Sequence, residues 1–184
     1  MSTATDVSTL TGTYAIDASH SVIGFSARHA MVAKVRGSFT DFAGSFTLDG
    51  ANPAASSAQI VIQTASIDTN SVDRDGHLKS ADFLNVEANP TLTFTSTAVK
   101  VKGDDTYIVT GDLTLGAITK SIDVTFELLG TSTDPWGGSR VGFEGHAEFS
   151  RKDFGLVWNV ALETGGVLVG DTVKINLDIS AVKQ

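Results

Sequence analysis

The chain has 184 residues, with 13 Lys and Arg against 21 Asp and Glu, which gives a formal net charge of −8 at pH 7. This length predicts one domain, and the acidic balance without a basic cluster argues against nucleic acid as a partner. The absence of cysteine excludes disulfides, a thiolate nucleophile, iron–sulfur clusters and Cys-ligated zinc. Abundant Val, Thr and Ile, with 18 Gly and only 3 Pro, indicate a β-rich protein.

The first residues, Met1 to Gly12, are polar and rich in Ser and Thr. They show neither the basic leader nor the apolar run of a signal peptide, so we expect a cytoplasmic protein whose residues 1–11 form a disordered or loosely ordered tail. Later segments stay well short of the ~18 consecutive apolar residues of a membrane-spanning helix. Residues 12–184 are therefore expected to form a single soluble domain.

Apolar residues alternate with polar or small ones along most of the chain, which is the pattern of β-strands with one dry and one wet face. About eight such strands are expected, and Tyr14 with Ile16 adds a short one at the start. The dry faces contain, in chain order, Ile23, Phe25 and Ala27; Phe42, Gly44, Phe46 and Leu48; Ile60 and Ile62; Leu92 and Phe94; Tyr107, Val109, Leu113 and Leu115; Ile122, Val124, Phe126 and Leu128; Val141, Phe143, Ala147 and Phe149; and Val173, Ile175, Leu177 and Ile179.

The opposite faces of these strands are polar and are expected to face solvent, as Lys174, Asn176 and Asp178 illustrate. Because each dry face needs a partner surface, a single antiparallel sheet must fold over as a sandwich or close as a barrel. Turn signals such as Gly103-Asp104-Asp105 and Gly116-Ala117 fall between the strands. Several strands span ten residues or more, and this length favours a barrel.

The alternation lapses in two places. Between Asp68 and Pro90 the spacing of apolar residues predicts a short helix near Arg74–Leu84, capped by Ser71 or Asp73 and covering one end of the barrel. Between Gly155 and Gly170 the chain is too apolar for an ordinary exposed loop. A helix and an apolar loop inserted in an all-β chain are expected near the mouth of a cavity.

Sequence motifs of known chemistry are missing. The four histidines do not fall at metal-ligand spacings, and no serine lies in a G-x-S-x-G elbow. The Gly-Gly pairs lack the pattern that cradles a phosphate. We therefore predict no catalytic residue, no metal and no cofactor.

Two polar clusters and the aromatic residues leave alternatives open. The first cluster contains Arg74, Asp75 and His77, and the second contains Arg151 and Asp153. In one interpretation these residues form ion pairs that attach the helix and the late loop to the barrel. In the other, Arg74 or His77 contacts the polar head of a ligand at the mouth. The interior of an eight-stranded barrel is either filled by side chains or holds one ligand. The sequence alone favours neither outcome, because small residues share the dry faces with the aromatic ones. These small residues are Ala27, Gly44, Ala98, Gly111, Gly145 and Ala147.

An ordered set of short segments extends from Gly12 to Val182. The segments include Ile16-Asp17, His20-Ser21-Val22, Gly24-Phe25, Arg28-His29, Val35-Arg36-Gly37-Ser38-Phe39, Ala65-Ser66-Ile67-Asp68-Thr69, Arg74-Asp75, His77-Leu78, Ser80-Ala81-Asp82-Phe83, Pro90, Phe94, Ser96, Gly111-Asp112-Leu113-Thr114, Thr119-Lys120, Arg151-Lys152-Asp153-Phe154-Gly155 and Gly170-Asp171-Thr172-Val173. This set resembles the YceI-like family of polyisoprenoid-binding, lipocalin-like proteins, and it is the order of the segments rather than any single one that is specific.

The resemblance implies an all-β fold, an eight-stranded antiparallel lipocalin-like barrel with a helix over one end and a hydrophobic tunnel for an extended prenyl chain. Gly116-Ala117-Ile118 departs from the family pattern and predicts a reshaped hairpin. Family members are bacterial proteins that are often periplasmic or secreted. The residues expected to contact the lipid are Phe25, Phe42, Phe46, Ile60, Ile62, Phe83, Leu84, Phe94, Val109, Leu113, Phe126, Phe143, Phe149, Phe154, Trp158 and Leu177.

The function that follows is storage, sequestration or transport of a polyisoprenoid or similar amphiphile, for example a prenyl quinone or a fatty-acid-like lipid, without covalent chemistry. His29, Arg74 and His77 are the polar candidates at the mouth. One alternative is a filled barrel that acts as an interaction module, for instance as a homodimer through an outer sheet face. Another is an enzyme acting on an amphiphile, but the sequence offers no evident pair of base and nucleophile.

Overall fold

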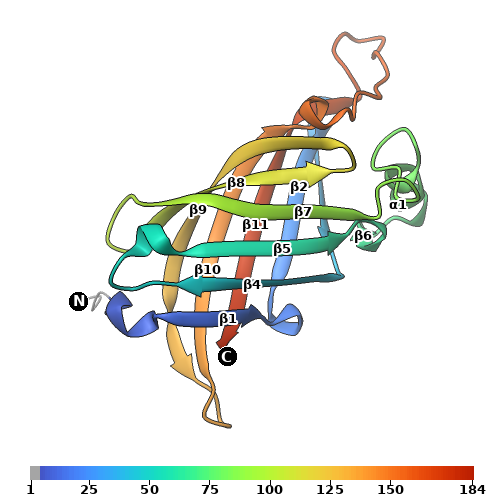
Figure 1. Cartoon of the computed structure of the whole chain (residues 1–184). Coiled ribbons are helices and arrows are strands. Elements are labelled where there is room, and N and C mark those ends of the chain that lie inside the picture. The colour runs from blue at the N-terminus through green and yellow to red at the C-terminus, as the bar shows by residue number, and fades with distance from the viewer. Residues whose placement is uncertain (1–4) are drawn as a thin grey trace.

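The computed structural model describes residues 5–184 (Figure 1). Its strands form one antiparallel sheet that closes on itself, because β1 (Gly12–Ile16) pairs with both β4 (Phe42–Leu48) and β11 (Val169–Lys183). The closed ring continues from β4 to β11 through β5 (Ser57–Gln63), β7 (Thr91–Val101), β8 (Thr106–Leu115), β9 (Ile118–Thr133) and β10 (Ser139–Ser150).

Three short strands complete the wall: β2 (Val22–His29), β3 (Ala33–Phe39) and β6 (Ile67–Asp68). Each forms one strand of the barrel together with a strand of the ring, from which a short break separates it. β1 and β2 both pair with β11, and β3 and β4 are consecutive in the chain. β6 comes after β5 and pairs with β3, as β5 pairs with β4. The sheet of 11 strands is therefore an eight-stranded meander in which three neighbouring strands are kinked. The number of strands agrees with the eight that the alternation predicts, whereas the kinks were not predicted.

Hydrogen bonds hold the kinks in place. At the break between β1 and β2, which contains the short helix η2 (Ala18–His20), the Asp17 amide donates to the Ser180 carbonyl at 2.8 Å. The Ser21 hydroxyl replaces a backbone partner, because it accepts from the Ser180 amide at 2.9 Å. The Asp17 carboxylate also accepts from Arg140 of β10 at 2.8 Å, so neighbouring strands stay joined where the ladder fails.

The only α-helix in residues 5–184, α1 (Val72–Lys79), lies over one end of the barrel (Figure 1). It starts two residues before the expected Arg74 and stops well before Leu84. The Ser71 side chain caps its first turn by accepting from the Arg74 amide at 3.4 Å. At the other end the Ser80 hydroxyl donates to the His77 carbonyl at 2.6 Å, which satisfies that carbonyl and ends the helix.

The meander places its connections at two ends. The end with α1 also carries the β2–β3 turn, the tight β8–β9 turn at Gly116-Ala117, and the segment 151–168 that begins with η5 (Arg151–Phe154). The opposite end carries both termini and the β4–β5 connection with η3 (Pro53–Ala55). A turn of η4 (Thr64–Ser66) precedes β6. None of the helices in residues 5–184 is long and apolar enough to cross a bilayer.

The N-terminal segment has more structure than expected. Residues 1–4 lie outside the described residues, but Val7–Leu10 form the short helix η1, where a loosely ordered tail was expected to reach residue 11. Leu10 is buried and its carbonyl accepts from the Tyr14 hydroxyl at 3.0 Å. The sequence signals for this turn are the i, i+3 spacing of Val7 and Leu10 and the N-cap residue Asp6, whose carboxylate accepts from the Ser8 amide at 3.1 Å.

The Asp17 contacts predict a pH-dependent stability. Hydrogen bonds from Ser19, then from Arg140 and His20, hold the pKa of the Asp17 carboxyl well below its usual range. A carboxyl whose pKa is lowered by folding stabilises the protein above its unfolded pKa of about 4, and this contribution is lost as the pH falls further. Asp17→Asn should lower the free energy of unfolding by about 1 kcal/mol at pH 7, and by much less near pH 2.

Urea denaturation at both pH values measures this effect. Asp104→Asn, in an exposed hairpin turn, is the control and should unfold like the parent. Equal losses for Asp17→Asn at neutral and acid pH would contradict the electrostatic account.

Candidate functional site

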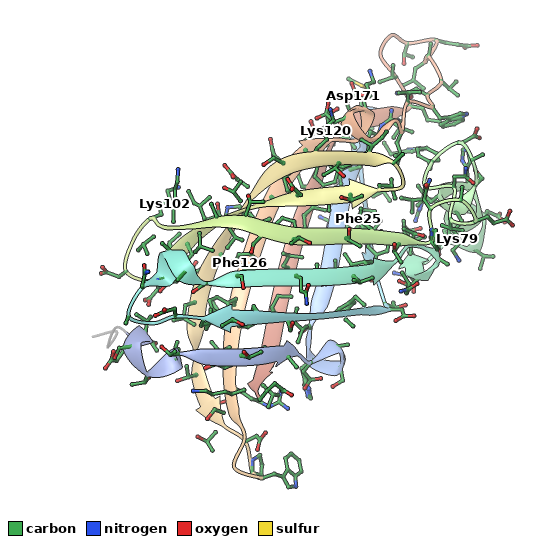
Figure 2. All side chains as sticks on the ribbon, in the orientation of Figure 1. Phe25, Lys79, Lys102, Lys120, Phe126 and Asp171 are labelled. Atoms are coloured by element: carbon green, nitrogen blue, oxygen red, sulfur yellow. The ribbon has the colours of Figure 1, made fainter. Side chains whose placement is uncertain are left out.

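A cavity of about 210 Å³ lies inside the barrel. Its lining comes from every strand of the ring and is almost entirely apolar. In Figure 2, Phe25 and Phe126 lie within the outline of the barrel, whereas the charged Lys79, Lys102 and Lys120 lie at its margins. The barrel is therefore hollow rather than completely filled by its own side chains.

Most of the residues expected to contact a lipid line this cavity. They occupy the inward positions of the alternating pattern on β2, β4, β5 and β7 to β11. They are Phe25, Phe46, Ile60, Ile62, Phe94, Val109, Leu113, Phe126, Phe143, Phe149 and Leu177.

The other five expected residues lie elsewhere. Phe42, Leu84 and Phe154 are buried in a core cluster and do not line the cavity. Leu84 and Phe154, together with Leu115, close the end of the barrel under α1 and η5. Phe83 and Trp158 pack on His77, with ring centroids 5.0 and 4.6 Å from the imidazole.

The three polar mouth candidates all lie at this closed end. His29 is exposed at the end of β2. Arg74 donates to the Thr69 hydroxyl and carbonyl, both at 2.8 Å, and so ties α1 to β6. His77 lies 2.9 Å from the Asp82 carboxylate. None of the three lines the cavity.

The segment after β10 is fixed to the barrel by a buried guanidinium. Arg151 is only 3% exposed, and it donates to the carbonyls of Leu156 at 2.6 Å, Trp158 at 2.9 Å and Gly170 at 2.9 Å. Burial lowers the pKa of Arg151, and the nearby Asp171 carboxylate partly offsets this. The role of Arg151 in this structure is to position the loop.

Glycines opposite aromatic rings create the hollow. Phe25 lies directly across from Gly37, and a Cβ at Gly37 would come within 2.5 Å of the Phe25 ring. Phe126 faces Gly145 in the same way, at 2.6 Å. The ring of Phe94 covers Gly111, where an added Cβ would overlap the ring. Because each ring lies against a glycine, it rests on the barrel wall and leaves the centre open.

Two rings narrow the cavity near its middle. Phe46 of β4 and Phe143 of β10 meet inside the barrel edge to face, with centroids 5.8 Å apart, although their strands are not neighbours. Phe46 also stacks on Tyr14 at 5.4 Å, and Phe143 contacts Phe126 at 6.2 Å. Lining residues lie on both sides of the Phe46–Phe143 pair, which therefore forms a constriction.

The polar part of the lining was missed by the sequence analysis. Asp49 and Ser56 lie in the connection between β4 and β5, at the end away from α1. Ser45, Ser57 and Gln59 also border the cavity, but they alternate with the inward Phe46 and Ala58 and so occupy outward positions of their strands. No motif distinguishes these residues in the sequence, since each is typical of an ordinary turn or wet strand face.

The short helix η1 covers this side. Val7 and Leu10 line the cavity, and Gly50 lets η1 approach closely, because a Cβ there would lie 1.9 Å from the Val7 carbonyl oxygen. The Gly50 amide also donates to the Thr11 hydroxyl at 3.0 Å. The N-terminal segment is thus part of the cavity wall.

The cavity offers little reactive chemistry. Its lining includes no His, Lys or Arg, and Asp49 is its one carboxylate. Within residues 5–184, no three His, Asp or Glu side chains converge as metal ligands would. The arrangement is suited to holding an apolar molecule.

The Phe126–Gly145 pair can be tested by filling the glycine. Gly145→Val should push the Phe126 ring into the cavity, lower the free energy of unfolding by about 1–3 kcal/mol, and reduce uptake of the apolar dye N-phenyl-1-naphthylamine. Urea denaturation and dye fluorescence measure the two effects. Gly142→Val is the matched control, because on the same strand its nearest contact is an ordinary 3.9 Å. Unchanged dye uptake in Gly145→Val would show that the pair does not shape the cavity.

Comparisons with known proteins agree with this architecture. The YceI-like domain family matches residues 14–181. A UPF0312 protein of Ectopseudomonas mendocina (strain ymp) is 41% identical over 173 residues, which cover 93% of this chain and 87% of the relative. The crystal structure of BcnA from Burkholderia cenocepacia is similar with a TM-score of 0.77 at 24% identity, covering 90% of this chain and 98% of BcnA.

A third similarity is to a polyisoprenoid binding domain from Saccharophagus degradans, implicated in plant cell wall breakdown. Its TM-score is 0.69 at 17% identity, and the match covers 93% of this chain and 98% of that domain. Because their sequence identities are low, the two solved structures support only the fold. Membership of the family is supported by the sequence matches to the family and to the UPF0312 protein. From its sequence and its closed barrel alike, this chain belongs to the YceI-like domain family.

Proposed function

We propose that this protein binds a lipid of polyisoprenoid character, such as a prenyl quinone, inside its barrel and stores, sequesters or carries it. The observation that supports this proposal is the apolar cavity enclosed by all the strands of the ring. The similarity to a domain described as polyisoprenoid-binding supports the same class of ligand. A lining without His, Lys or Arg favours binding over catalysis.

Hydrocarbon burial would supply the affinity. Each CH₂ group removed from water contributes about 0.8 kcal/mol, less the entropy lost when a flexible chain is ordered. The cavity of about 210 Å³ is smaller than the roughly 300–1,000 Å³ of most ligand pockets. A long prenyl chain therefore requires the Phe46 and Phe143 rings to rotate away from each other, which makes this constriction the determinant of chain length.

The polar head belongs on the side of β4 and β5. There Asp49 and Ser56 of the β4–β5 connection supply hydrogen-bonding groups, whereas the α1 end is closed by buried Phe154 and Leu84. Burial, reinforced by Asp105, raises the pKa of Tyr107, so this lining phenol stays protonated and can donate a hydrogen bond. The sequence favoured His29, Arg74 and His77 for the head, and the proposal prefers the other end because these three residues do not line the cavity.

Native mass spectrometry of the purified protein, followed by organic extraction, tests the proposal directly. A stoichiometric prenyl lipid, or saturable uptake of an added prenyl quinone by the empty protein, is the expected result. A protein that carries nothing and does not bind added prenyl quinones or fatty acids would favour the alternative of an interaction module instead.

Blocking the cavity on its polar side should abolish uptake. Ala58 lines the cavity directly opposite Phe46 on the neighbouring strand, so Ala58→Trp should lower prenyl quinone binding at least about tenfold. Ala43→Trp places the same side chain on the exposed outer face of β4 and is the control. Tryptophan quenching titrations measure both. Full binding by Ala58→Trp would place the ligand elsewhere.

A further inference from the structure

Exposed apolar side chains gather at the α1 end of the barrel. Met31 is 59% and Val32 is 80% exposed in the β2–β3 turn, and Val157, Val160 and Val167 are 63%, 45% and 37% exposed in the segment after η5. We call these five residues the apolar tip. Figure 1 shows that the segment after η5 projects beyond the end of the barrel. The tip is therefore a narrow protrusion rather than a groove or a flat face.

The two loops of the tip form one unit. The Ala30 amide donates to the Leu168 carbonyl at 2.7 Å. Met31 lies on Gly166, where a Cβ would come within 3.1 Å of its sulfur. Within the projecting segment, the Leu162 amide donates to the Gly166 carbonyl at 3.0 Å and Ala161 pairs with Val167.

The β2–β3 turn displays its apolar residues despite backbone strain. Ala30 and Met31 have φ values of 50° and 68°, and the Val32 amide donates to the His29 carbonyl at 3.3 Å. His29 pairs with Ala33, so three residues connect the two strands. Within this connection, the turn from His29 to Val32 has both central residues in the left-handed region, as in a type I′ turn, a geometry that favours Asn-Gly. Ala-Met here keeps strain that Asn-Gly would relieve, and strain of this kind persists where the side chains serve a function.

The charges around the β2–β3 turn are all positive. Arg28, Lys34 and Arg36 are exposed, together with His29. Residues 18–40 contain no Asp or Glu, although the whole chain has a net charge of −8. In the segment after η5, residues 154–170 contain a single charged side chain, Glu163. Nearby Asp171 is paired with Lys152 at 3.0 Å.

We propose that the apolar tip inserts into the surface of an anionic lipid bilayer, with Arg28 and Lys34 contacting lipid phosphates. Apolar side chains on a narrow protrusion can reach below the headgroups, and basic residues beside them add attraction to anionic lipid. The barrel then stands with its α1 end toward the membrane. This proposal does not depend on what occupies the cavity.

Vesicle co-sedimentation of the full chain tests the proposal. Vesicles of phosphatidylcholine with about one-third phosphatidylglycerol should bind the protein more tightly than pure phosphatidylcholine, and added salt should weaken the binding. Arg28→Gln and Lys34→Gln should each lower the partition coefficient about fivefold. Val101→Ser combined with Lys102→Gln, at the opposite end, is the control and should bind like the parent.

The decisive variant combines Ala30→Asn with Met31→Gly. It gives the turn its favoured sequence, so its melting temperature should equal or exceed that of the parent while binding to anionic vesicles falls several-fold. If that variant fails to fold, Met31→Ser combined with Val32→Ser, which leaves Ala30 in place, tests the same loss of insertion. Unchanged vesicle binding by a folded tip variant, or no binding by the parent, overturns the proposal. A parent dimer that the tip variants dissociate, without vesicle binding, would assign the tip to a second copy of the chain.

Discussion

The rings of Phe25, Phe94 and Phe126 lie against glycines of neighbouring strands, and this packing decides whether the barrel is filled or hollow. An eight-stranded barrel has an interior that its own side chains can just fill. Here a Cβ on Gly37, Gly111 or Gly145 would push a ring toward the centre. The cavity, its apolar lining and its constriction at Phe46 and Phe143 all depend on these rings remaining on the wall.

The two ends of the barrel differ in kind. At the α1 end, apolar side chains including Leu84, Leu115 and Phe154 close the interior, and Arg151 fixes the loop above them. At the other end, buried Leu10, Tyr14 and Leu128 pack with Phe46 and Phe143, and η1 covers the β4–β5 connection through the close approach at Gly50. The proposed head site and the proposed membrane contact therefore lie at opposite ends, so they can be altered separately by mutation.

The kinks in the first part of the wall explain why the sequence predicted the number of strands only approximately. The alternation of Ile23, Phe25 and Ala27 continues the inward face of Tyr14 and Ile16 after η2, so one strand of the barrel is interrupted without losing its orientation. Ser21 and Asp17 bridge the break with side-chain hydrogen bonds. Serine and aspartate are equally common in turns, so their position alone could not reveal this role.

The sequence by itself determined an antiparallel all-β fold, because period-two alternation fixes which side chains of each strand face the interior. The alternation allowed a sandwich or a barrel, and the length of the strands with the family resemblance favoured the barrel that the structure shows. It also identified most of the cavity lining, since Phe46, Val109 and Leu177 occupy inward positions of that pattern. Only the tertiary structure decided that Leu84 and Phe154 close one end while Val7 and Leu10 of η1 line the cavity. Which end of a barrel is closed depends on how loops pack across strands distant in sequence, and alternation along one strand carries no information about that packing.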